Sequence, residues 1–192
     1  MKRMLPIARS DIHAHLTREA VDILFGKGYK LTNIRNLTIP GQFACAETLE
    51  VEGPGGSIKG VVVVGPERSY NQIEISFTNG LALGITPVLR DSGDLKGSPG
   101  ALLKGPVGEL RLEEGVIAAK RHIHMHTEDA RDFGVVNGES VKIIVPGERG
   151  LVFDNVIVRV GPENALEMHI DFDEGFAAQV EDFMLVELVK TS

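Results

Sequence analysis

The sequence has few of the residues that mark several large classes of protein. It contains one cysteine, Cys45, no tryptophan and only 5% aromatic residues. One cysteine cannot form a disulfide within the chain, and so few aromatic rings do not suggest a stacking surface for single-stranded nucleic acid. A single cysteine is most commonly a small buried apolar side chain, so we do not assign Cys45 as a nucleophile.

Long apolar runs and basic runs are also absent. Val61 to Val64 is far too short to span a membrane, and Met1 to Ser10 lacks the apolar segment of a signal peptide. The net charge is −7, whereas affinity for nucleic acid requires a continuous basic face. We therefore expect a cytoplasmic protein that binds neither membranes nor nucleic acid. Any anionic substrate would be held by placed arginines, helix N-termini or metal ions.

Short strand-like segments at close spacing dominate the first half of the chain. The 192 residues, of which 43% are hydrophobic, can supply the core of one domain or of two small ones. Turn signals such as Pro40-Gly41 and Gly53-Pro54-Gly55-Gly56 separate these segments. The segments, which favour a barrel or a sandwich, are Asn36 to Ile39, Gln42 to Val51, Ile58 to Val64 and Gln72 to Ser76.

The segment from Gly84 to Lys104 is different, because glycine, proline and small polar residues dominate it. It is too long for a simple turn. A loop of this length in a compact domain is either a flexible linker or a binding loop, and composition alone does not separate the two.

Two His-x-His pairs contain four of the six histidines, namely His13 with His15 and His122 with His124. Residues two apart in an extended strand point to the same face, so each pair sends two imidazoles into one space, as metal chelation requires. A single pair would arise as easily by chance in a half-exposed strand. The second copy favours a role as metal ligands.

The two pairs belong to a longer internal repeat with a constant offset of 109 residues. Each pair precedes a short helix that opens at a threonine, Thr17 or Thr127, and ends at a glycine. Further along, Val62 to Pro66 parallels Val158 to Pro162. The sequence therefore predicts two copies of one structural unit.

Continuing the repeat aligns Gln72 to Ile75 with Glu167 to Ile170, so that Glu74 and His169 occupy equivalent positions. Without the repeat, Glu74 would be interpreted as a strand residue facing solvent. His126 begins the second helix, and we interpret it as an exposed or outer-sphere residue. Three protein ligands with an open position are typical of catalytic zinc, although cobalt, iron and nickel accept the same ligand types. The two predicted ligand sets are His13, His15 and Glu74, and His122, His124 and His169.

Five separated motifs resemble those of the phosphate propanoyltransferases of propanediol-type microcompartments, the PduL-type phosphotransacylases. The motifs, which follow the order of that family across nearly the whole chain, are Pro40-Gly41-Gln42, Arg90 to Leu95, Gly97 to Gly100, Arg121 to Met125 and Met168 to Asp171. The resemblance implies a mainly β fold of two pseudo-repeated β-barrels, each capped by short α-helices. Residues 12–119 would form one barrel, and residues 120–192 would form the other, completed by the N-terminal strand within residues 1–11.

The resemblance also implies a function in propanediol degradation, as a homodimer with two zinc ions per chain. The reaction would exchange an acetyl or propanoyl group between coenzyme A and phosphate. The ligand set with Glu74 would hold one zinc together with the coenzyme sulfur, and the set with His169 would hold the other together with water. Arg68 matches the phosphate-binding arginine of the family, while Arg90 and Ser92 would line the coenzyme cleft.

The chain departs from the family pattern at several positions, among them Phe172 and Gly175-Phe176, which follow the motif ending at Asp171. Ile12 stands where the family usually has arginine, and Phe77 and Asn79 stand where arginine and aspartate are usual. Fewer cations near a site for anions bear on affinity and on acyl preference. Only Met1 to Pro6 precede the first strand, without the extension that directs members into microcompartments, so we expect a free cytoplasmic enzyme rather than one enclosed in a shell.

Two other functions fit the same residues. A zinc-dependent acyl-CoA hydrolase would use water in place of phosphate, and a non-catalytic, metal-stabilised barrel would bind acyl-CoA without turnover. Dependence of thiol release on phosphate separates the transferase from the hydrolase.

Overall fold

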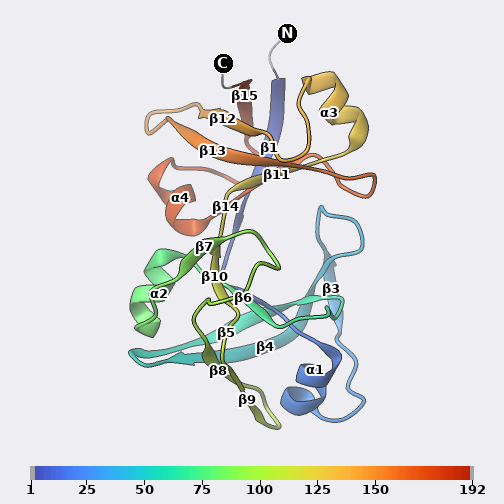
Figure 1. Ribbon diagram of the computed structural model, residues 1–192, viewed down its shortest axis with the longest axis vertical. Helices are drawn as coiled ribbons and strands as arrows, with labels where there is room; N and C mark the ends of the chain where they lie inside the picture. The colour runs from blue at the N-terminus through green and yellow to red at the C-terminus, as the bar shows by residue number, and fades with distance from the viewer. Residues whose placement is uncertain (1–2, 191–192) are drawn as a thin grey trace. The chain divides into compact units, whose positions relative to one another are not determined.

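The computed structural model describes residues 3–190, which form fifteen strands and four short helices (Figure 1). The predicted mainly β fold is confirmed. The helices are α1 (Arg18–Phe25), α2 (Phe77–Leu83), α3 (Thr127–Phe133) and α4 (Phe172–Ala177). The strands are β1 (Arg3–Ser10), β2 (His13–His15), β3 (Asn33–Asn36), β4 (Phe43–Gly53), β5 (Gly56–Gly65), β6 (Gln72–Glu74), β7 (Val88–Arg90), β8 (Ala101–Lys104), β9 (Glu109–Leu112), β10 (Val116–Ala119), β11 (His122–Met125), β12 (Ser140–Val145), β13 (Leu151–Val160), β14 (Glu167–Asp171) and β15 (Leu185–Lys190). No helix within residues 3–190 combines the length and the apolar character needed to cross a membrane.

The chain divides into two compact units, and each unit is built from more than one segment of the sequence. The first unit contains β1, Thr38–Pro40 and the chain from Lys120 onward, and the second contains Asp11–Leu37 and Gly41–Ala119. The chain passes from β1 to β2, and later from β10 to β11, through two residues, Asp11-Ile12 and Lys120-Arg121. Each His-x-His pair therefore begins directly after the chain has changed units.

The first unit is a closed barrel with the strand order β1-β14-β11-β13-β12-β15. Its closure joins the first and last strands of the chain, since β1 pairs antiparallel with β15 and parallel with β14. Alternate side chains along each strand point inward, as a barrel requires. The core includes Leu5, Ile7, Ile123, Met125, Val141, Ile143, Val158 and Met168, each of them fully buried.

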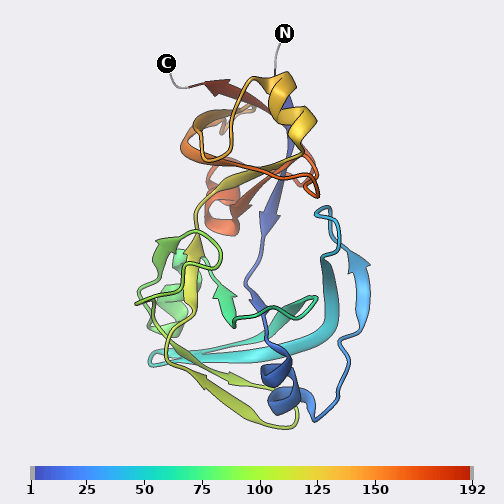
Figure 2. The same cartoon turned by 45° about the vertical axis from the view of Figure 1, so that its right-hand side comes forward.

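The second unit is a nine-stranded sheet with the order β7-β10-β6-β2-β5-β4-β8-β9, and β3 pairs with β4. Its longest strands, β4 and β5, are drawn in cyan and teal in Figure 2. The amide of Val116 in β10 donates to the carbonyl of Pro99, close before β8, at 2.9 Å. The core of this unit holds Cys45, where burial raises the pKa of the thiol to about 11, in agreement with a structural cysteine.

The two helices that the sequence predicts begin close to the predicted residues. Thr17 caps α1, accepting a hydrogen bond from the amide of Ala20, and the helix ends at Gly26. The predicted start of α3 at Thr127 is confirmed, but Thr127 is not its cap: His126 is the N-cap, and its Nδ1 accepts from the amide of Glu128 at 3.2 Å. His126 therefore has a structural role at the start of α3.

Helices α2 and α4, which follow the equivalent strands β6 and β14, were not predicted from the sequence. Ser76 and Asn79 form a capping box at the start of α2, and Asp171 and Glu174 form one at the start of α4. These pairs, spaced three residues apart, are a helix-start signal that the sequence does contain. The two helices extend the internal repeat beyond the histidine strands.

The predicted loop from Gly84 to Lys104 is shorter than expected, because β7 and β8 occupy parts of it. The remaining residues are folded into the second unit. The buried Ser98 hydroxyl accepts from the amide of Gly115 at 2.8 Å, and the amide of Gly93 donates to Gln72 at 2.7 Å. These contacts argue against a flexible linker.

Candidate metal centres and anion site

The first candidate metal centre lies where β2 and β6 pair in antiparallel register, with His13 directly opposite Glu74. His13 Nε2 is 3.7 Å from Glu74 Oε2, and His15 Nε2 is 3.9 Å from Glu74 Oε1. One ligand atom from each of the three residues can be chosen so that all lie within 4.8 Å of one another. The three side chains form a set that could hold a metal ion.

Backbone carbonyls fix how the two histidine rings of this set are presented. His13 Nδ1 contacts the carbonyl of Asp11 at 2.8 Å, and His15 Nδ1 contacts that of Val64 at 3.3 Å. If each Nδ1 carries the donated proton, each Nε2 keeps its lone pair for a metal ion. Burial, with smaller effects of His13 and Arg68, lowers the pKa of His15 to about 2, so that this ring is neutral at physiological pH.

The second candidate centre repeats this arrangement in the other unit, where β11 pairs antiparallel with β14 and His122 lies opposite His169. His122 Nδ1 contacts the carbonyl of Lys120, two residues earlier, at 2.8 Å, as His13 does with Asp11. The Nε2 atoms of His122 and His124 lie 3.0 Å apart. Burial is the main cause that lowers the pKa of His122 well below its usual value, followed by the charge of Arg159.

A cluster of polar side chains adjoins the first centre in the second unit. Arg68 donates to the hydroxyls of Tyr70 and Ser92 at 3.2 and 3.4 Å, and to Gln42 Oε1 at 3.3 Å. These acceptors are all uncharged, so they do not neutralise the guanidinium. Arg68 is therefore suited to hold an anion near His15, whose pKa its charge helps to lower.

Gln72 connects this cluster to the first candidate centre. It is fully buried, and its Oε1 accepts from the amide of Gly93. That contact fixes the orientation of its amide group, so that Nε2 donates to Glu74 Oε1 at 2.6 Å and to Ser92 Oγ at 2.8 Å. Gln72 thus holds the carboxylate ligand and the loop serine in one network.

The structure brings together most of the predicted site residues. The six predicted ligands form two sets, and Arg68 and Ser92 lie in the network beside Glu74. Arg90 is different, because its guanidinium pairs with Asp94 at 3.6 Å and contacts the carbonyl of Leu89. Neither contact connects Arg90 with the ligand set of this unit.

Two buried polar residues beside the ligands were not predicted, namely Gln72 and Glu167. They lie opposite the second histidine of each pair, since Gln72 faces His15 and Glu167 faces His124. The repeat contained the signal, because both residues stand two positions before a predicted ligand and therefore on the same strand face.

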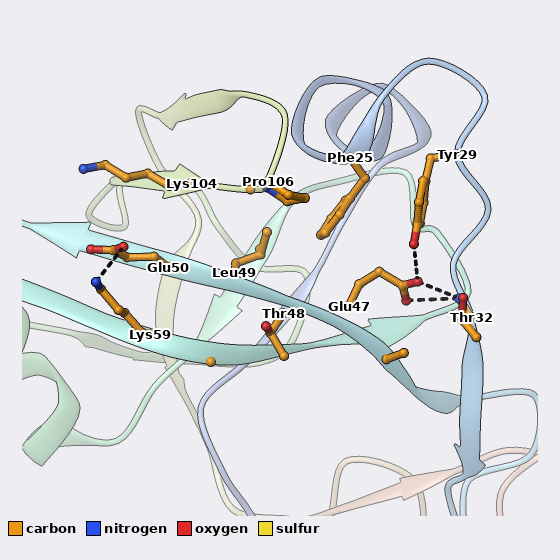
Figure 3. A pocket seen from close by; sticks show the side chains of 13 residues that line it. Phe25, Tyr29, Thr32, Glu47, Thr48, Leu49, Glu50, Lys59, Lys104 and Pro106 are labelled. Carbon is orange, nitrogen blue, oxygen red and sulfur yellow. Dashed lines mark hydrogen bonds and ion pairs between the residues drawn. The ribbon is translucent and has the colours of Figure 1, made fainter.

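A separate pocket lies in the second unit around Phe25, Tyr29 and Glu47 (Figure 3). None of the predicted site residues lines it. Both Glu47 oxygens accept hydrogen bonds, from the Tyr29 hydroxyl and the Thr32 amide, and Lys59 pairs with Glu50 at 3.8 Å. Neutral donors thus satisfy Glu47, and Lys59 pairs with Glu50, so the pocket has no evident ligand chemistry.

The fold and the site define a class of β protein in which two repeated strand pairs each gather three possible metal ligands. Comparison with known proteins identifies the family within this class. Residues 6–181 match the family model described as phosphate propanoyltransferase, so the chain belongs to the phosphate propanoyltransferase family.

Curated relatives carry the same name and match nearly the whole chain. A phosphate propanoyltransferase of Thermotoga maritima is 50% identical, over 94% of this chain and 87% of its own length. One from Listeria monocytogenes is 45% identical, over 96% of this chain and 86% of its own length. One from Clostridioides difficile is 44% identical, over 97% of this chain and 89% of its own length.

Proposed function

We propose that this chain is a phosphate acyltransferase that converts an acyl-CoA and phosphate into an acyl phosphate and coenzyme A. The observation that carries the proposal is the match of residues 6–181 to the phosphate propanoyltransferase family, with relatives of that name along nearly the full length. The acyl group is short, acetyl or propanoyl. The reaction forms a bond between a phosphate oxygen and the acyl carbon, and it breaks the bond from that carbon to sulfur.

Each ligand set is proposed to hold one zinc ion. The donors are five imidazoles and one carboxylate, which suit zinc, and three protein ligands in each set leave a position open. The neutral state of the buried His15 and His122 rings supports this assignment, because only a neutral imidazole has a lone pair for a metal. When bound, zinc would lower the pKa of a coordinated thiol and so favour the coenzyme A thiolate as leaving group and, in reverse, as nucleophile.

The residues around the first centre are assigned to the two substrates. The set of His13, His15 and Glu74 would meet the coenzyme sulfur, and Arg68 would bind phosphate through its planar fork of donors. The contacts of Arg68 to Tyr70 and Ser92 hold that guanidinium in place. Anchoring the phosphate in this way orients an oxygen toward the acyl carbon and reduces the entropic cost of the reaction.

Arg90 and Ser92 are proposed to contact coenzyme A. Ser92 supports this role through its position between Arg68 and Gln72. Arg90 is about a third exposed and is held by a long ion pair to Asp94, so its guanidinium can turn toward an anionic group at low cost.

An assay of acyl transfer tests the proposed function. Purified protein is mixed with acetyl-CoA or propanoyl-CoA, and free thiol and acyl phosphate are measured with and without phosphate. We expect thiol release that depends on phosphate and equals the acyl phosphate formed. Equal thiol release in the absence of phosphate would indicate a hydrolase, and no release under either condition would indicate a binding protein.

A further inference from the structure

Glu167 lies beside the second ligand set but does not belong to it. It precedes His169 by two residues on β14, so both side chains project from the same face of the strand. Only 3% of Glu167 is exposed, and its Oε2 lies 2.7 Å from His169 Nε2. Its Oε1 is buried and has no hydrogen-bond partner within residues 3–190.

A buried carboxylate with an unpartnered oxygen is costly to the fold unless a positive charge lies close by. Within the second set, Glu167 contacts the ring of His169, which a neighbouring dication would polarise. Arg159 brings one positive charge to this centre, where it acts on His122, and the position of Glu167 suits a centre that also holds a metal cation.

The first centre also has one carboxylate on its ligand strand, but at the other of two equivalent positions. The neutral Gln72 of the first centre is equivalent to the carboxylate of Glu167 in the second. The carboxylate of Glu74 in the first centre is equivalent to the imidazole of His169 in the second. The first strand pair therefore directs two histidines and one carboxylate toward its centre, and the second directs three histidines and one carboxylate. Moving the carboxylate from one position to the other preserves the charge of the centre.

We propose that Glu167 is a positioning residue of the second metal centre, which accepts a hydrogen bond from His169 Nε2–H and so directs His169 Nδ1 to the metal ion. This inference rests on the proposed zinc sites. It makes His169 differ from His13 and His122, where a backbone carbonyl contacts Nδ1 and leaves Nε2 for the metal. A carboxylate partner also increases the basicity of the ligand ring and adds a negative charge near the dication.

Zinc titration of the full chain, stripped of metal and measured against a competing chelator, tests this proposal. Glu167→Gln keeps the shape of the side chain and removes its charge. We expect the wild type to bind two zinc ions and the variant to retain one site unchanged, while the other weakens by about 10- to 100-fold. Glu74→Gln should weaken the first site, which contains His13 and His15. Glu163→Gln makes the same chemical change at an exposed residue in the same unit as Glu167, and it should weaken neither site.

A second measurement needs no substitution. Long-range proton–nitrogen spectra of the zinc-loaded, histidine-labelled wild type distinguish which ring nitrogen holds a proton and which binds the metal. We expect His169 to be protonated on Nε2 and metal-bound through Nδ1, opposite to His13 and His122. His169 bound through Nε2 would overturn the proposal.

The outcomes separate this inference from the function on which it rests. Unchanged zinc affinity in Glu167→Gln, or equal weakening of both sites, would overturn the role of Glu167 while two zinc sites remain. A wild type that takes up no zinc would contradict the metal centres and this inference together, and the phosphate-dependent assay would still decide the activity.

Discussion

His122 lies directly opposite His169 across β11 and β14, as His13 lies opposite Glu74 across β2 and β6. In both places the histidine strand also pairs parallel with a long strand on its other side, β13 or β5. The same local strand arrangement thus recurs in two separate units. We infer that it is the element that builds each candidate metal centre.

Removal of metal should abolish the activity. A chelator strong enough to strip zinc would remove from the set of His13, His15 and Glu74 the cation proposed to stabilise the thiolate, so acyl phosphate formation should fall to background. Adding about two equivalents of zinc should restore it, whereas magnesium, which prefers oxygen ligands, should not. Activity that survives complete removal of zinc, verified by elemental analysis, would contradict the role of the metal.

Substitution of Arg68 should act on phosphate more than on acyl-CoA. A hydrogen bond to a charged group contributes about 1.5–3 kcal/mol, so Arg68→Ala should raise the KM for phosphate by about 10- to 100-fold. Arg68→Lys keeps the positive charge but loses the forked guanidinium, so its KM for phosphate should lie between those of the wild type and Arg68→Ala. Arg18→Ala removes an exposed arginine of the same unit that pairs with Glu67 and Asp22, and is the control. Wild-type phosphate dependence in Arg68→Ala would refute the assignment.

The metal-free chain should lose stability as the pH falls below about 6.5. The unfolded chain binds a proton at His15 below that pH, while the folded chain, with a pKa of about 2 for this ring, does not. The free energy of unfolding should therefore fall by ~1.4 kcal/mol per pH unit for His15, and His122 is shifted in the same direction. Urea unfolding between about pH 7 and pH 5 measures the slope. In His15→Gln that slope should be smaller, and an equal slope in both proteins would contradict the buried neutral ring.

His126 should contribute to stability and not to metal binding. Its ring caps α3, so His126→Ala should lower the free energy of unfolding by ~1 kcal/mol, the usual effect of losing an N-cap. Asparagine is a favourable cap, and His126→Asn should restore most of the loss. Zinc content should be the same in all three proteins. A loss of zinc in His126→Ala would show that the residue belongs to a metal centre after all.

Much of the candidate site could be predicted because the information is local. The same-face spacing of His13 and His15 follows from strand geometry, and the repeat identifies Glu74 and His169 as partners without any knowledge of the sheet. The strand pairing agrees, since it places each of these residues opposite the first histidine of its pair.

The unpredicted features depend on the sheet or on weak local signals. The burial of Gln72 and Glu167 results from strand pairing on both sides, which no single segment specifies. The helices α2 and α4 are only 7 and 6 residues long, too short for an amphipathic period to reveal them, although their capping boxes are present. The pairing of Arg90 with Asp94 depends on a loop conformation that composition does not determine.

Elemental analysis of the purified chain is the decisive test of the two metal centres. We expect about two zinc ions per chain in the wild type, and about one in each of the single variants His13→Gln and His122→Gln, because the two sets share no residue. A wild type without zinc after gentle purification, or variants that retain both ions, would refute the metal centres.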